Sequence, residues 1–208
     1  MAHKENINIQ ESENENGSLE SIEFEIIVDA LKSKKKGDPL QHELILGRHG
    51  IGNSTLLRSI KLEIDGQAEL SEKYVAINHL AEEQNTIYRL SDLWYEVLQE
   101  LAIRFQKPLN LRNSDSFEDE QTFAKYLYTE IHRLLTAADR RAVLLLDNLD
   151  RILENLDHDA HLLRETLLNY NDLQIIGAST CMTEHFGSHS RPFYDFFRYH
   201  RLEERAFE

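Results

Sequence analysis

The chain has 208 residues, with 37 acidic side chains, 23 Lys or Arg side chains and a formal net charge of −14. Its length predicts one large domain with its own core, and its negative charge argues against a surface dominated by nucleic-acid binding. No run approaches the roughly 18 apolar residues of a membrane span, the N-terminus has no apolar signal segment, and one cysteine excludes an internal disulfide framework. We therefore expect an acidic cytoplasmic protein with no membrane partner.

The N-terminal residues 1–18 are rich in Glu, Asn and Ser and poor in large apolar side chains. They bury too little apolar surface to offset the entropy of ordering, so we expect a disordered acidic tail ahead of one domain at 19–208. The run LESIEFEIIVDAL (19–31) fits both helical and strand spacing. The Lys-rich segment that follows it, ending at Gly37, is typical of a helix C-terminus and favours a helix.

Apolar runs and amphipathic patterns alternate along the rest of the chain. The apolar runs predict buried strands at 42–47, 74–80, 142–147 and 173–179, with a fifth candidate at 197–202. The amphipathic patterns predict helices from about 53, at 91–105, at 117–138 (with a capping-box-like start at Ser116 and Asp119), at 158–169 and near 190–196. Strands separated by helices predict an α/β fold, a three-layer parallel sheet covered by helices on both faces.

The first motif follows the first predicted strand. It is the segment Gly47-Arg48-His49-Gly50-Ile51-Gly52-Asn53-Ser54, followed by Thr55. It fits the phosphate-binding pattern G-x-x-x-x-G-K-[ST] except at the lysine position, where this chain has Asn53. In this pattern, glycines let backbone N–H groups and a helix N-terminus surround phosphate oxygens, and Ser54 would ligate Mg²⁺. The alternative is an ordinary Gly-rich turn.

The missing lysine changes the expected chemistry of this loop. Asparagine donates hydrogen bonds but carries no charge and is too short to reach a γ-phosphate. We therefore expect Asn53 to weaken ATP binding and to reduce hydrolysis severely.

The second motif is the predicted strand that ends at Asp147. Its position predicts a Walker B acid that holds Mg²⁺ beside the phosphate loop, and the alternative is a turn acid that caps the next helix. The next residue is Asn148, which is not a general base. Asp150, Glu82 and Glu83 are therefore the further candidates for catalytic acids, the last two because they follow the second strand.

Three segments together resemble one family. GRHGIGNSTLL, LLLDNLDRIL and LQIIGAST occur in the order and context of P-loop ATPases of the AAA+ and signal-transduction (STAND) type, within the ASCE group. The resemblance implies ATP and Mg²⁺ as cofactors, switching linked to oligomerisation, and Ser179 or Thr180 as a sensor of the γ-phosphate. The sequence ends where such families continue into a helical lid, so we expect the lid to be absent.

Other patterns carry weaker alternatives. An arginine of the C-terminal region could contact the nucleotide of a neighbouring protomer, and the candidates are Arg191, Arg198 and Arg201. Three possible zinc ligands follow a helical spacing of four residues: Cys181, His185 and His189. For both sets the alternative is an ordinary surface role. The cluster of Lys32 and Lys34–Lys36 could contact DNA phosphates or an acidic partner, although a solvated helix end is the favoured interpretation.

The leading functional hypothesis is an ATP-binding regulatory domain, a nucleotide switch in a larger assembly that works as a homo-oligomer or on a protein effector. The alternative is a non-catalytic pseudo-ATPase scaffold in a defence or DNA-transaction complex. A third hypothesis, a DNA-processing accessory ATPase, depends on the lysine cluster.

Overall fold

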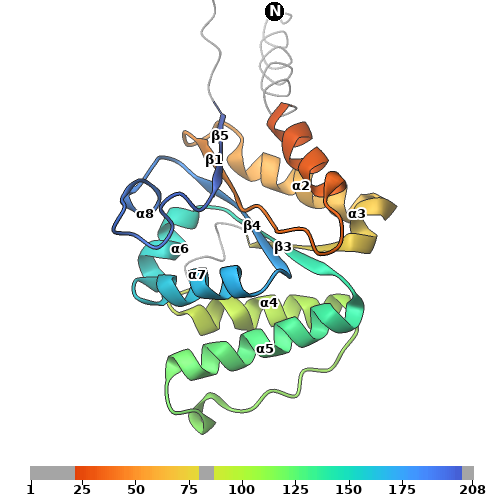
Figure 1. Ribbon diagram of the computed structural model, residues 1–208, viewed down its shortest axis with the longest axis vertical. Coiled ribbons are helices and arrows are strands. Elements are labelled where there is room, and N and C mark those ends of the chain that lie inside the picture. Colours follow the sequence, from red (N-terminus) through yellow and green to blue (C-terminus); the bar gives the residue numbers. More distant parts are fainter. Residues whose placement is uncertain (1–21, 80–86, 203–208) are drawn as a thin grey trace, which may run out of the picture.

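The computed structural model describes residues 22–79 and 87–202, and its centre is one sheet of five parallel strands (Figure 1). The strands are β1 (Glu43–Gly47), β2 (Tyr74–His79), β3 (Arg141–Leu146), β4 (Leu173–Ser179) and β5 (Arg198–Leu202), in the spatial order β2-β3-β4-β1-β5. The five predicted strands are therefore confirmed. Because they are all parallel, their carboxyl ends meet at one edge of the sheet.

Helices cover both faces of the sheet. They are the helical residues 22–33, α2 (Asn53–Gly66), α3 (Ala68–Lys73), α4 (Leu90–Arg104), α5 (Glu120–Ala138), α6 (Leu149–Leu156), α7 (Asp159–Asn169) and the short α8 (Glu184–Gly187), with a 3-10 turn at Ser114–Ser116. Residues 22–33, α2 and α3 lie on one face, and α4, α5, α6 and α7 lie on the other (Figure 1). The three-layer α/β fold is thus confirmed.

The two faces hold two separate apolar cores. Alternate residues of β3 illustrate this, since Leu144 belongs to the same core as Trp94 of α4, whereas Leu145 belongs to the same core as Ile60 of α2. Every residue of β1 and of β4 is buried. This burial on both sides explains why these strands read as continuous apolar runs rather than as alternating patterns.

Some helix predictions were wrong. The long helix begins at Glu120, because the Asp119 side chain accepts the Thr122 N–H at 2.7 Å, and Ser116 belongs to the preceding 3-10 turn. The predicted helix near 190–196 is a series of turns, and Asp195 there has a φ of 50°. Helices α3 and α6 were not predicted.

None of the helices within the described ranges is long and apolar enough to cross a membrane.

Gly177 of β4 provides a test of the packing between the sheet and α6. A Cβ at this position would lie 2.4 Å from Cδ2 and 3.2 Å from Cβ of Leu149. We expect Gly177→Ala to destabilise the fold by about 1–3 kcal/mol, because the first turn of α6 must move. Gly66→Ala is the matched control: nothing lies within 4 Å of its Cβ, so it should leave stability unchanged or raise it. Chemical unfolding of the two variants measures both effects, and equal stabilities would contradict this packing argument.

Candidate functional site

The loop between β1 and α2 lies at the carboxyl edge of the sheet. Gly50 and Gly52 have φ angles of 83° and 118°, which side-chain-bearing residues rarely adopt. The Ile51 N–H donates to the Arg48 carbonyl at 3.1 Å, and this turn brings the chain back onto the start of α2. Gly52 is the N-cap of α2 and provides no side-chain cap, so the first N–H groups of the helix are left for another acceptor.

Gly47 is required by the close packing of this loop. A Cβ there would lie 2.4 Å from Asn53 Oδ1 and 2.6 Å from Ile51 Cγ2. The end of β1 therefore approaches the first turn of α2 more closely than any other residue would allow.

Asn53 occupies the position of the expected lysine and holds the loop together. Its Nδ2 donates to the Gly47 carbonyl at 2.8 Å, so its amide joins the two ends of the loop. The residue is only 9% exposed, and its Oδ1 is buried without a hydrogen-bond partner among the described residues. The loop is thus closed by a neutral side chain.

Ser54 and Asp147 are in contact although 93 positions separate them in the sequence. The Ser54 hydroxyl donates to Asp147 Oδ2, and the Asn148 N–H donates to Oδ1 of the same carboxylate at 2.9 Å. Asp147 is 5% exposed. A hydroxyl and a buried carboxylate at the loop are hard oxygen ligands of the kind that Mg²⁺ prefers.

The other predicted site residues have different environments. Arg48, His49 and Thr55 are exposed around the loop, and Ile51 is half-buried. Asp150 lies in the first turn of α6, with Oδ1 buried and without a partner among the described residues. Glu82 and Glu83 lie outside the described residues.

The two sensor candidates follow the end of β4. Ser179 is buried, and its hydroxyl donates to the Cys181 carbonyl at 2.9 Å. Thr180 is exposed. Of these two residues, only Thr180 therefore presents its side chain to solvent at the edge of the sheet.

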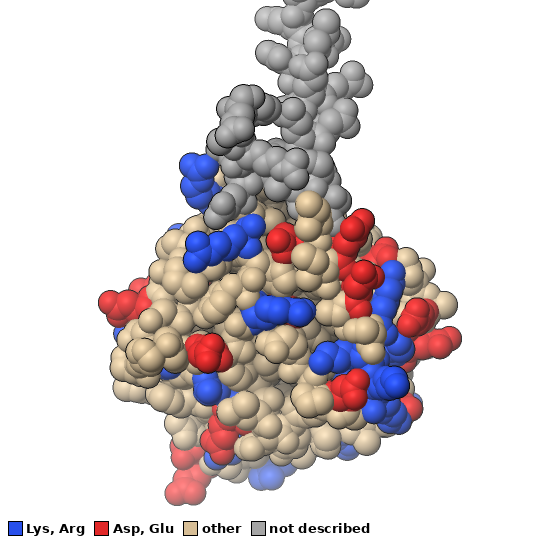
Figure 2. Space-filling model, turned by 45° about the horizontal axis from the view of Figure 1, so that its top comes forward, with Lys and Arg blue, Asp and Glu red and all other residues tan. Residues whose placement is uncertain are grey.

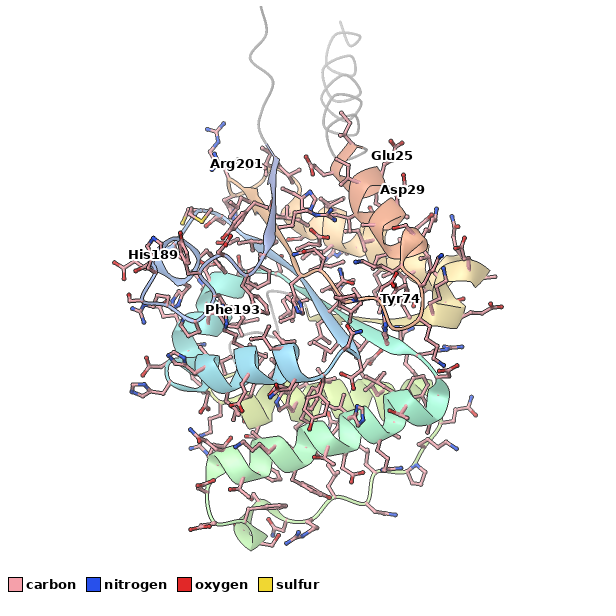
Figure 3. The ribbon with its side chains drawn as sticks, in the orientation of Figure 1. Glu25, Asp29, Tyr74, His189, Phe193 and Arg201 are labelled. Carbon is pink, nitrogen blue, oxygen red and sulfur yellow. The ribbon has the colours of Figure 1, made fainter. Side chains whose placement is uncertain are left out.

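The zinc pattern and the C-terminal arginines have separate environments, and Arg201 lies opposite Leu46, one residue before the glycine loop. Within the described ranges, no group of three or more His, Cys, Asp or Glu side chains is placed to hold a metal ion. Arg191 pairs with Glu184 at 3.6 Å, whereas Arg201 is exposed at the end of β5 (Figure 3). His189 lies in the segment that follows α8, as Figure 3 also shows.

A buried ionic cluster at the amino-terminal ends of β1 and β5 was missed by the sequence analysis. Glu43 of β1 is fully buried and accepts hydrogen bonds from the Arg198 guanidinium and, at 2.9 Å, from His200 Nε2. The other ring nitrogen of His200 contacts Glu23 of helix 22–33 at 2.5 Å. Burial alone would lower the pKa of His200, but the hydrogen bonds to Glu43 and Glu23 outweigh it, so the pKa is raised. The charged cluster joins β1, β5 and this helix.

A second missed residue is His42, directly before β1. It is 6% exposed, its ring stacks on Phe196, and its Nδ1 accepts the Ile175 N–H at 3.0 Å. Burial lowers its pKa to about 4. His42 is therefore a neutral structural residue at physiological pH. The only sequence signal for its burial is its position directly before a buried strand.

Several solved structures resemble this fold, whereas no family model and no curated protein sequence matches the chain. The Aeropyrum pernix ORC1 protein, solved in complex with DNA, superposes with a TM-score of 0.61 at 11% identity over 92% of this chain and 46% of its own. The Aeropyrum pernix ORC2 protein, solved as ADPNP-ADP complexes, gives 0.58 at 13% identity over 91% and 47%. Cdc6p from Pyrobaculum aerophilum gives 0.54 at 14% identity over 89% and 44%.

This chain has the P-loop ATPase fold. It spans less than half the length of each of these proteins, and identities this low establish the fold alone. Within this fold, the loop at Gly47–Gly52 and the acid at Asp147 lie at the edge where the strands end.

Proposed function

We propose that this P-loop domain binds ATP with Mg²⁺ and acts as a regulatory switch of the AAA+ or STAND type in a larger assembly. The observation that supports the proposal most directly is the Ser54–Asp147 hydrogen bond beside the glycine loop. It joins the two motifs that the sequence analysis assigned to phosphate and to magnesium. The ADPNP-ADP complexes of a protein with the same fold add support for a nucleotide.

The residues of the loop fit a phosphate group. The uncapped first turn of α2 offers N–H donors, and exposed Arg48 adds a positive charge beside them. Ser54 and Asp147 have oxygen atoms suited to ligate a magnesium ion. When bound, this ion would neutralise negative charge on the phosphate oxygens. In the proposed switch, exposed Thr180 reports on the terminal phosphate from the end of β4.

Hydrolysis by this chain is expected to be slow for two reasons. Asn53 provides no cation for the terminal phosphates, and Asn148 provides no general base next to Asp147. Asp150 is the remaining candidate, because its Oδ1 has no partner among the described residues and its carboxylate could orient a water molecule. A switch that binds nucleotide and hydrolyses it slowly suits a homo-oligomer or a complex with an effector protein.

The alternative is a pseudo-ATPase scaffold that assembles a defence or DNA-transaction complex without nucleotide. The Asn53–Gly47 hydrogen bond favours it, because this bond closes the loop without any ligand. A role of DNA as partner has weaker support, since Lys and Arg side chains are interspersed with Asp and Glu on the face shown in Figure 2.

Calorimetric titration of the full chain with ATP, in Mg²⁺ or in EDTA, separates these functions. We expect Mg·ATP to bind, and Ser54→Ala to weaken its binding by about tenfold, or about 1.4 kcal/mol, by removing an oxygen ligand of the metal. The binding of ATP in EDTA should change less in this variant. Ser71→Ala removes a serine hydroxyl from α3 as the matched control. No heat of binding with Mg·ATP in the unmodified chain would favour the scaffold.

A further inference from the structure

A cavity lies at the opposite edge of the sheet from the glycine loop. Its volume is about 950 Å³. It is bounded by the end of helix 22–33, the α3–β2 junction, the end of α5 and the start of β4. Tyr74 marks the place in Figure 3, where it lies at the end of helix 22–33 that is remote from Arg201. This size is typical of a site that binds a ligand.

The cavity carries an excess of positive charge in a strongly acidic chain. Its lining contains seven Lys or Arg residues and three acidic residues: Lys32, Lys34, Lys35, Lys36, Lys73, Arg140 and Arg141, and Glu72, Asp139 and Asp172. Part of this charge is already compensated. Lys36 pairs with Asp139, and Lys73 pairs with Glu69 at 2.9 Å. The side chains of Lys35 and Arg140 have no ion-pair partner among the described residues.

Helix α5 forms one wall of the cavity. Thr136 lines it together with Leu135, which is fully buried, and Asp172 of the lining is engaged by the Tyr128 hydroxyl and by His132. Helices α3 and α5 end at this edge, and the negative ends of their dipoles are compensated by some of the surrounding Lys and Arg side chains. Glu63 and Glu69 lie outside the lining and pair with Lys32 and Lys73, so two of the four excess positive charges are compensated and two remain.

These features favour an acidic peptide over a nucleic acid. Single-stranded nucleic acids bind through exposed aromatic rings on which the bases stack. The one Tyr of the lining, Tyr74, is 2% exposed, and its hydroxyl donates to the Leu31 carbonyl at 3.2 Å. The carboxylates of an acidic peptide match the lysines of the rim.

The chain itself contains a segment of the matching chemistry. In an extended conformation, alternate residues fall on the same face. For residues 7–15 one face then carries two isoleucines followed by three glutamates: Ile7, Ile9, Glu11, Glu13 and Glu15. The other face carries only amides and a serine: Asn8, Gln10, Ser12 and Asn14. The three carboxylates suit the basic rim of the cavity.

The length of the chain permits this contact. The cavity lies at the far end of helix 22–33, about 18 Å from its start at a rise of about 1.5 Å per residue. An extended chain covers that distance with about six residues at roughly 3.3 Å each. Residues 7–15 can therefore reach the cavity from residue 21.

We propose that this basic cavity is the docking site of residues 7–15 of the same chain. The acidic face of the segment pairs with Lys35, Arg140 and their neighbours. Because the site is remote from the glycine loop, docking does not depend on nucleotide binding and is tested separately.

A spin-label experiment on the full chain tests the contact. In a Cys181→Ser background, a nitroxide attached at Asn14→Cys lies on the face opposite the glutamates. We expect line broadening of the backbone amides of residues 32–37 and 135–141 in NMR spectra at low salt. The broadening should fall at least threefold when Glu11, Glu13 and Glu15 are changed to Gln, or with Arg140→Glu, and should persist with the control Lys107→Glu. No broadening of these amides in the starting protein would overturn the proposal.

Two further samples distinguish other occupants. Broadening that appears only when spin-labelled and isotope-labelled chains are mixed would assign the segment to a second copy and overturn docking within one chain. A single-stranded oligonucleotide should not bind to the cavity. Shifts of the amides of residues 135–141 on adding it, unchanged when the three glutamates are neutralised, would instead identify a nucleic-acid site.

Discussion

Asn53→Lys should raise the affinity of the chain for Mg·ATP by about tenfold to a hundredfold. The reason is that a hydrogen bond to a charged group contributes about 1.5–3 kcal/mol, whereas the Asn53 amide is already used on the Gly47 carbonyl. A ligand present at a hundredfold excess over its Kd stabilises the folded state by about 2.7 kcal/mol. For a chain of this size, the corresponding rise in Tm is about 5–10 °C. Thermal unfolding with and without millimolar Mg·ATP measures it.

Asn53→Met is the control for the shape of the loop. Methionine approaches lysine in length and also removes the amide that joins the ends of the loop, but it carries no charge. We expect it to lower the Tm without ligand and to bind Mg·ATP no better than the unmodified chain. If Met raised the affinity as much as Lys, the charge argument would be wrong. Unchanged binding in Asn53→Lys would remove the loop from the nucleotide site.

Glu43→Ala should destabilise the fold by about 3–5 kcal/mol, because it leaves the positive charges of Arg198 and buried His200 without their shared carboxylate. The expected fall in Tm is about 10 °C. Chemical unfolding at pH 6 measures the change in free energy. Glu25→Ala, on the exposed side of helix 22–33 (Figure 3), is the matched control and should have little effect.

The same cluster predicts a pH dependence of stability. The folded-state pKa of His200 is raised, so its contribution is fully present below its unfolded pKa of about 6.5 and is lost as the pH rises through the folded value. The unmodified chain should therefore lose stability as the pH rises above about 6.5 and through the raised folded pKa of His200. His200→Gln should flatten this slope, and an unaltered slope in that variant would locate the titration elsewhere.

The strands and the two motifs could be predicted from the sequence because their signals are local. Val143–Leu146 is apolar without alternation, and Gly47–Ser54 has a fixed spacing of glycines. The short helices could not be predicted in this way. Helix α3 buries only Leu70, which gives no periodic pattern, and α6 follows so closely on Asp147 that its residues were interpreted only as part of the motif.

Other features depend on contacts between distant segments. The buried Glu43 cluster exists because β1 and β5 pair in parallel, with Glu43 opposite Arg198 and Ile45 opposite His200. The helix predicted near 190–196 fails because Phe193 and Phe196 pack edge to face with each other, with ring centroids 5.1 Å apart, and Phe196 stacks on His42. Neither pairing leaves a pattern within its own segment.

The position of β1 between β4 and β5 has a consequence for synthesis of the chain on the ribosome. Glu43 reaches its partner Arg198 across 155 positions, and His42 reaches Ile175 across 133. Pairing over such separations is slow, because the intervening loop must close first. The strand that bears the glycine loop is made early but acquires its neighbours last. Until β5 emerges, its apolar edge stays unpaired, and this interval is when the nascent chain is most prone to aggregate or to need a chaperone.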